Sequence, residues 1–177
     1  MVGRPDFSEF VAARSTALLR TAYLLTGDEA TAEDLLQTTL VKCWRSWPRL
    51  TDQPEPYVHA VLVNTFLSWR RRRWHGETPS AALPEVAVQD STGVVDERAA
   101  VRVALRRLPP RQRAVVVLRY FDDLSEVDTA RLLGISVGTV KSQSSKALAA
   151  LRIDRDLAAE RPTREVQTHV VDGAGPA

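Results

Sequence analysis

The segment from Leu124 to Leu151 constrains the fold of this chain more than any other feature. Its sequence, LSEVDTARLLGISVGTVKSQSSKALAAL, predicts two helices joined by a tight turn. Ser125 followed by Asp128 forms an S-x-x-D capping pattern for the first helix. Gly134 suits the turn, and Ser136 is placed to cap the second helix. This combination is typical of a helix-turn-helix motif.

The second predicted helix has two faces of opposite character. One face carries a core-facing stripe, made of Val137, Val140, Ser144, Ala147, Leu148 and Leu151. The other carries small residues flanked by two lysines, namely Gly138, Ser142, Ser145 and Ala149 with Lys141 and Lys146. Small side chains let a helix approach base edges while lysines meet phosphates. An ordinary helical hairpin with a solvated face is the alternative. The caps, the turn and the absence of acids in the second helix favour DNA binding.

Composition excludes several classes of function. The chain of 177 residues is long enough for one medium domain or two small ones. No apolar run reaches the length of a membrane span, and the N-terminus lacks a signal pattern. We therefore expect a cytoplasmic protein without membrane insertion. The single cysteine, Cys43, is predicted to be a buried hydrophobic residue. The three histidines lack metal-ligand spacing and no catalytic or phosphate-loop motif occurs, so no enzyme activity, metal or cofactor is predicted.

Helical periodicity, together with the glycine and proline residues that interrupt it, predicts an all-α fold in two blocks. The first block contains helices at 7–26, 28–47 and 56–73, separated by glycine and proline signals. The second contains helices at 96–108 and 111–121, followed by the helix-turn-helix. The predicted boundaries are 1–75 for the first block, 76–95 for a linker, 96–155 for the second block, and 156–177 for a tail expected to be disordered.

The segment between the blocks differs in composition from both of them. Residues 76–95 contain no Lys or Arg, and all their charges are acidic. Proline, glycine and small residues interrupt any apolar period. These features predict a flexible acidic linker, with a short strand at 85–89 as a weakly supported alternative.

Four consecutive arginines, Arg70–Arg73, end the third predicted helix. One or two cations would be explained by the negative end of the helix dipole. Four adjacent cations repel each other unless a polyanion lies alongside, which favours nucleic acid. Most aromatic residues of this block are expected in the core, although those near the arginines can stack on unpaired bases. On the second helix, Asp34 beside an exposed Leu35 is either a solvated surface or a partner contact, and the residues alone leave this undecided.

Four motifs together resemble the extracytoplasmic-function sigma factors of bacterial RNA polymerase. They are AEDLLQTTLVKCW at 32–44, VLVN at 61–64 with its arginine run, LPPRQRAVVVLRYFDDLS at 108–125, and GISVGTVKS at 134–142. The resemblance covers about Phe7 to Arg152 in the family's order, and the following Q-S-S-K is most similar to the SigE-type branch of actinobacteria. It implies two small helical domains joined by the linker: σ2, a three-to-four-helix bundle, and σ4, a helix-turn-helix domain. It also implies a non-enzymatic subunit that directs core polymerase to promoters.

The resemblance implies a role for each candidate residue. The β′ coiled-coil clamp of core polymerase would be contacted by Asp34, Leu35 and Gln37, and the β flap by σ4. The −10 element would be recognised and melted by Asn64, Trp69, Arg70, Arg71, Arg72 and Arg73. The −35 element would be read by Ser136, Thr139, Lys141, Ser142, Ser145 and Lys146. The protein is expected to be monomeric when free, and an anti-sigma factor is left open as a further partner.

The sequence departs from the family's pattern at a few positions. Thr38 stands where the family often has Glu, Thr129 replaces a usual aliphatic residue, and Gln143-Ser144 replaces a common Arg-Leu pair. Ser144 predicts looser packing, and the missing arginine at 143 removes a phosphate contact. The alternative function is a helix-turn-helix regulator that binds intact duplex DNA as a dimer, without polymerase. A more distant alternative is an adaptor that uses the first block only for protein contact.

Overall fold

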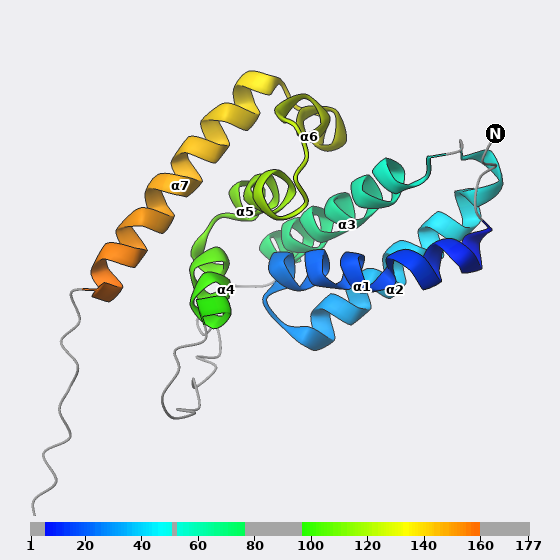
Figure 1. Ribbon diagram of the computed structural model, residues 1–177, viewed down its shortest axis with the longest axis horizontal. Helices are drawn as coiled ribbons and strands as arrows, with labels where there is room; N and C mark the ends of the chain where they lie inside the picture. The colour runs from blue at the N-terminus through cyan, green and yellow to red at the C-terminus, as the bar shows by residue number, and fades with distance from the viewer. Residues whose placement is uncertain (1–5, 51–52, 77–96, 160–177) are drawn as a thin grey trace, which may run out of the picture.

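The computed structural model describes residues 6–50, 53–76 and 97–159, and within them every element is a helix (Figure 1). This confirms the predicted all-α class. The first block contains α1 (Phe7–Thr26), α2 (Glu29–Ser46), the 3₁₀ turn η1 (Trp47–Arg49) and α3 (Glu55–Gly76). The second contains α4 (Glu97–Arg107), α5 (Pro110–Val116), the π-helical turn η2 (Val117–Phe121), α6 (Glu126–Leu133) and α7 (Val137–Ala159).

Local capping signals fix the ends of the first helices. The Asp6 carboxylate accepts a hydrogen bond from the Ser8 N–H at 3.3 Å and so caps α1. Gly27 ends α1 in the left-handed conformation, with φ 76°. One residue further on, the Asp28 carboxylate accepts from the Thr31 N–H at 2.8 Å and caps α2. The hydrogen bonds from Thr31 lower the pKa of Asp28, as expected for a carboxylate bound by N–H and O–H donors.

One predicted boundary is wrong. The sequence predicts a disordered tail from 156, whereas α7 continues to Ala159. Leu157, Ala158 and Ala159 are strong helix formers and extend the helix past the charged stretch. The remainder of the tail, the acidic linker from 77 onward and the alternative strand at 85–89 lie outside the described residues.

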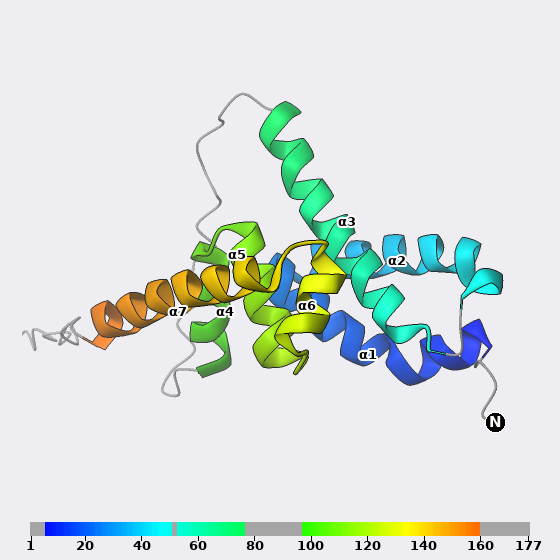
Figure 2. The ribbon, with the colours of Figure 1, turned by 90° about the horizontal axis from the view of Figure 1, so that it is seen from above.

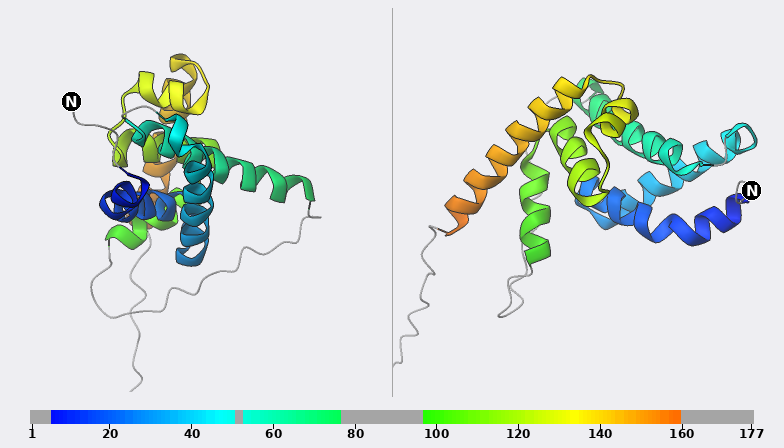
Figure 3. Two further views of the ribbon diagram at one scale, coloured as in Figure 1. Left: turned by 90° about the vertical axis from the view of Figure 1, so that its right-hand side faces the viewer. Right: turned by 45° about the horizontal axis from the view of Figure 1, so that its top comes forward.

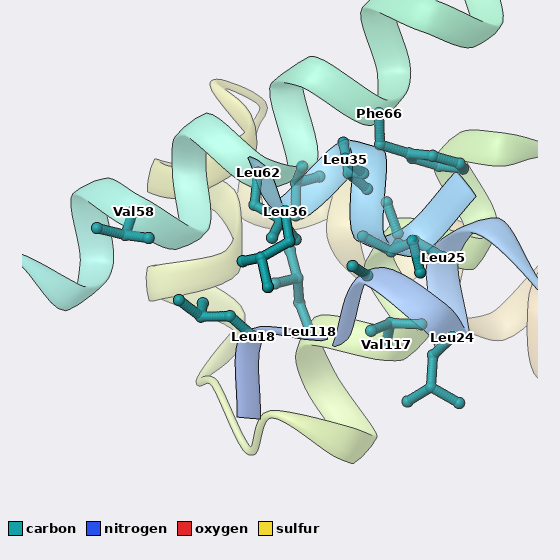
Figure 4. Close-up of a cluster of buried hydrophobic side chains, with 14 of the residues drawn as sticks. Leu18, Leu24, Leu25, Leu35, Leu36, Val58, Leu62, Phe66, Val117 and Leu118 are labelled. Carbon is teal, nitrogen blue, oxygen red and sulfur yellow. The ribbon is translucent and has the colours of Figure 1, made fainter. Parts of the chain in front are cut away.

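One hydrophobic core runs through both blocks (Figure 4). Leu18, Leu35 and Phe66 of the first block belong to the same buried cluster as Val117 and Leu118 of the second. A small separate cluster joins Val115 of α5 to Ala130 and Val140 of the helix-turn-helix. The linker predicted from the sequence suggests two separately packed units, but the structure packs them against each other.

Two helices extend beyond this shared core. The C-terminal part of α3 projects from the body on one side, and α7 extends away from it in another direction (Figures 2 and 3). The arginine run stands near the projecting end of α3. The arginine run therefore lies at the periphery, whereas the candidate −35 residues at 136–146 lie at the opposite end of α7, which packs within the helix-turn-helix.

Candidate nucleic-acid interface

The helix-turn-helix has the local geometry that its sequence predicts. The Ser125 hydroxyl accepts a hydrogen bond from the Asp128 N–H at 3.0 Å and begins α6. Gly134 ends that helix with φ 64°, a left-handed conformation that glycine adopts without strain. The Ser136 hydroxyl accepts from the Thr139 N–H at 3.1 Å and begins α7. All three capping and turn predictions are therefore confirmed.

The two predicted faces of α7 are also confirmed. Val140 and Ala147 are fully buried, Ser144 is 9% exposed, and the other members of the stripe are half-buried. Every residue of the opposite face is exposed, as are the two lysines beside it. Among the candidate −35 residues, Thr139 is half-buried and the other five are exposed. The Lys141 ammonium lies 3.7 Å from the Glu126 carboxylate, a surface pair worth little and easily exchanged for a phosphate contact.

Two of the departures from the family's pattern place hydroxyl groups in the core of the second block. Thr129 and Ser144 are buried, and neither hydroxyl has a hydrogen-bond partner among the described residues. A buried polar group without a partner costs free energy because its hydration is lost without replacement. The looser packing predicted at Ser144 stays a prediction; the structure shows at both positions a buried hydroxyl without a hydrogen-bond partner among the described residues.

Replacing Thr129 with Val is expected to raise the free energy of unfolding by about 1 kcal/mol, because valine keeps the shape and removes the unsatisfied hydroxyl. Thr39→Val is the matched control. Thr39 is equally buried, but its hydroxyl donates to the Leu35 carbonyl at 2.8 Å, so the same change is expected to be neutral or destabilising there. Urea denaturation followed by circular dichroism measures both. A Thr129→Val protein less stable than the wild type would show that its hydroxyl is satisfied.

The candidate −10 residues lie along the C-terminal half of α3. Asn64, Arg71 and Arg72 are exposed, whereas Trp69 and Arg70 are half-buried. Trp69 packs against the shared core, which limits how much of its ring can stack on a base. The side chain of Arg73 lies outside the described residues.

A cavity of about 670 Å³ opens between α3, the start of α5 and the helix-turn-helix. Its lining includes Asn64, Arg70 and Arg71 of the first block, and Thr139 and Gln143 of α7. Arg111 of the Pro-Pro-Arg step also lines it, a cation that the sequence analysis does not single out. The structure thus brings residues assigned to two different promoter elements to one cavity.

The candidate polymerase-binding residues do not share one surface. Asp34 and Gln37 are exposed on α2, but Leu35 is completely buried in the shared core. The prediction of an exposed Leu35 is wrong, because α2 packs between α1 and α3 and buries a wide stripe. Its side chain therefore supports the helix and is not a contact surface.

Two apolar residues that the sequence analysis does not select lie on the exposed side of α2. Val41 and Trp44 are 54% and 60% exposed, and with Gln37 they follow the three- and four-residue spacing of one helix face. The Trp44 ring packs edge-on against Phe7, with centroids 5.1 Å apart, which fixes its position. Trp47, by contrast, is buried against Phe7 and Phe10.

No cation site or reactive thiol emerges from the described part of the chain. Those residues contain no group of three or more His, Cys, Asp or Glu side chains able to hold a metal ion. Cys43 is buried as predicted, and burial raises the pKa of its thiol to about 11. In the same part of the chain, no helix combines the length and apolarity needed to cross a membrane.

Two family models match the chain, one for each block. Residues 10–76 match sigma-70 region 2, and residues 98–151 match sigma-70 region 4. The RNA polymerase sigma-E factor of Streptomyces avermitilis is 42% identical over 165 residues, which cover 90% of this chain and 92% of that protein. The sigma factor SigL of Mycobacterium tuberculosis is 34% identical, with 78% of this chain and 82% of that protein covered.

Among solved structures, the sigma factor RpoE of Bartonella quintana, in complex with the anti-sigma factor NepR, resembles the fold with a TM-score of 0.69. It is 27% identical, and the match covers 88% of this chain and 99% of that chain. The chain belongs to the sigma-70 family and is an RNA polymerase sigma factor of the extracytoplasmic-function type. The alternative of a polymerase-independent regulator is not favoured, because both family regions are present in order.

Proposed function

We propose that this sigma factor binds core RNA polymerase and directs it to a promoter class through two DNA contacts, with α7 reading the −35 element and α3 recognising and melting the −10 element. The observation that carries the −35 role is the exposed face of α7, where Ser142 and Ser145 are flanked by two exposed lysines. A helix with such a face can lie deep in the major groove. The protein acts in the cytoplasm and contributes binding energy, while catalysis belongs to the polymerase.

The −10 role draws on the exposed cations of α3. Arg71 and Arg72 are placed to hold the backbone of the displaced strand, and the exposed amide of Asn64 is placed to meet a flipped base. Trp69 stabilises this surface mainly by packing beneath it, because its ring is half-buried. The blocks at 1–75 and 96–155 act as the σ2 and σ4 domains.

The polymerase contacts follow from the exposed face of α2. We assign the β′ coiled-coil clamp to Asp34 and Gln37, extended by Val41 and Trp44, with Leu35 positioning the helix from the core. The σ4 domain is assigned to the β flap. The complex of the Bartonella quintana relative with NepR supports an anti-sigma protein as a further partner of this chain.

Transcription in vitro tests the proposal. Core polymerase is combined with or without this protein on promoters from its own genome, and initiation is expected only in its presence.

A Lys141→Ala/Lys146→Ala variant is expected to reduce the slope of log binding constant against log salt concentration for −35 DNA by about two units, one for each phosphate contact removed. Arg14→Ala/Arg20→Ala is the matched control, since it also removes two exposed cations, both of them on α1 and outside the helix-turn-helix. No polymerase-dependent initiation at any such promoter would overturn the sigma-factor proposal.

A further inference from the structure

One cavity of the molecule is lined by arginines from two helices. It is the cavity of about 670 Å³ between α3, α5 and the helix-turn-helix, elements that pack against one another in the fold (Figure 1). Small-molecule sites typically have volumes of about 300–1,000 Å³, and this cavity falls within that range. Arg70 and Arg71 line it from α3, and Arg111 lines it from the start of α5. None of the described residues in its lining is acidic.

The buried Arg113 adds to the positive potential near this cavity. Burial lowers the pKa of Arg113 to about 10, and the charges of Arg70 and Arg106 contribute to this effect. Arg70 is therefore close enough to Arg113 for the two guanidinium groups to repel each other. In the described part of the chain, Arg113 donates its hydrogen bonds to backbone carbonyls, which are neutral and do not cancel its charge. A bound anion would relieve this repulsion as well as attract the arginines in the lining.

The rest of the lining suits a flat group with polar edges. The aliphatic side chains in the lining are Leu67, Val115, Leu133 and Ile135. The neutral side chains that can form hydrogen bonds are Asn64, Ser68, Gln112, Thr139 and Gln143. Amide side chains pair with the edges of nucleobases, and apolar surfaces pack against their faces. An inorganic anion would use the arginines alone, whereas a nucleotide would use all three kinds of side chain.

We propose that this cavity is a binding site for a nucleoside diphosphate, whose phosphates bind Arg70, Arg71 and Arg111 and whose base packs on the aliphatic side chains. The guanidinium group suits phosphate because its planar fork donates two parallel hydrogen bonds to a pair of oxygens. A diphosphate provides several such oxygens, and its negative charge matches a lining with three cations. The site needs both domains, since α3 belongs to σ2 while α5 and α7 belong to σ4.

The same cavity contains candidate DNA contacts, so nucleotide and promoter DNA compete for these side chains. Asn64 and Arg71 are candidates for the −10 element, and Thr139 is a candidate for the −35 element. A nucleotide bound to them prevents them from binding DNA at the same time, and by linkage DNA weakens the nucleotide equally. This consequence rests on the proposed function, whereas nucleotide binding itself does not.

Isothermal titration calorimetry on the full chain tests the site without polymerase or DNA. GDP and ADP are each expected to bind one per chain with a Kd of roughly 10 μM. Pyrophosphate and guanosine are each expected to bind at least about tenfold more weakly, because each makes only part of the contacts. Pyrophosphate as tight as GDP would show a site for any anion, and a hexaglutamate peptide tighter than GDP would show a protein-docking surface. Either result, or no binding of nucleotide, would overturn the proposal.

Variants of the lining locate the bound nucleotide. Arg111→Ala is expected to weaken GDP binding about tenfold, because it removes a charged phosphate contact at a position that is not a candidate promoter contact. Arg20→Ala is the matched control, since Arg20 is also exposed but lies on α1, outside this cavity. Ser68→Phe places a ring in the cavity and is expected to abolish GDP binding, while circular dichroism reports whether the helices remain. If Arg111→Ala and Arg20→Ala lost affinity equally, the effect would be one of net charge and the site would be refuted.

Displacement of DNA from the free protein tests the competition. Saturating GDP is expected to raise the apparent Kd for fluorescently labelled single-stranded −10 DNA about fivefold or more with the wild type. With Arg111→Ala, the same concentration of GDP is expected to have a much smaller effect. GDP binding without displacement of DNA would overturn the competition and count against the DNA role of Asn64 and Arg71, whereas the calorimetric result alone decides whether the site exists.

Discussion

Replacing Arg71 and Arg72 with Ala is expected to reduce open-complex formation at least tenfold on duplex promoters. Both side chains are exposed near the projecting end of α3, outside the packing that holds Trp69. Removing one phosphate contact should lower the salt slope of binding by about 0.9 on duplex DNA or about 0.7 on single strands. Permanganate footprinting of the melted region and the salt dependence of complex formation measure the two effects.

The proposed melting role predicts a second result for the Arg71→Ala/Arg72→Ala variant. A promoter template with a premelted −10 region no longer needs strand opening, so most of the missing activity is expected to return on it. Binding to isolated −35 duplex is expected to be unchanged, because α7 retains its own exposed surface. Arg14→Ala/Arg20→Ala removes two exposed cations of α1, outside both candidate DNA surfaces, and controls for net charge. If premelted DNA did not rescue the variant, the arginines would serve binding and not melting.

Much of the fold could be predicted because its signals are local. The Ser125 and Ser136 caps, the glycine ends and the 3.6-residue period each act within about one turn of chain, where sequence spacing determines geometry. The exposed face of α7 followed from the same period. These local signals locate the helix-turn-helix and the candidate −35 surface.

The remaining features depend on packing between distant segments. Leu35 looks exposed beside Asp34, but α1 and α3 enclose its side of the helix. The contact between Thr21 and Asp122 joins residues 101 positions apart, and no periodicity can indicate it. The shared core of the two domains also depends on contacts between distant segments, since each half presents apolar faces whose partners the sequence alone does not indicate. Arg113 is the clearest example, because an arginine in a short helix suggests surface but is buried here.

Replacing Arg113 with Met is expected to lower the free energy of unfolding by about 3 kcal/mol or more, because several charged hydrogen bonds disappear together. Burial lowers the pKa of this guanidinium to about 10, with Arg70 and Arg106 contributing, so the side chain stays charged at neutral pH. Each hydrogen bond from a charged donor contributes about 1.5–3 kcal/mol, and the contributions are not additive. Methionine fills the space but leaves the Leu25, Arg106 and Leu108 carbonyls without this donor.

Replacing Arg113 with Lys tests whether a positive charge at this position is enough to stabilise the fold. Arg113→Lys keeps the charge, but its compact ammonium cannot present the planar fork that reaches the ends of both α1 and α4. We therefore expect it to be destabilised nearly as much as Arg113→Met in urea denaturation, while Arg111→Met, an exposed neighbour, stays near wild type. A stable Arg113→Lys protein would show that the interface needs only a positive charge.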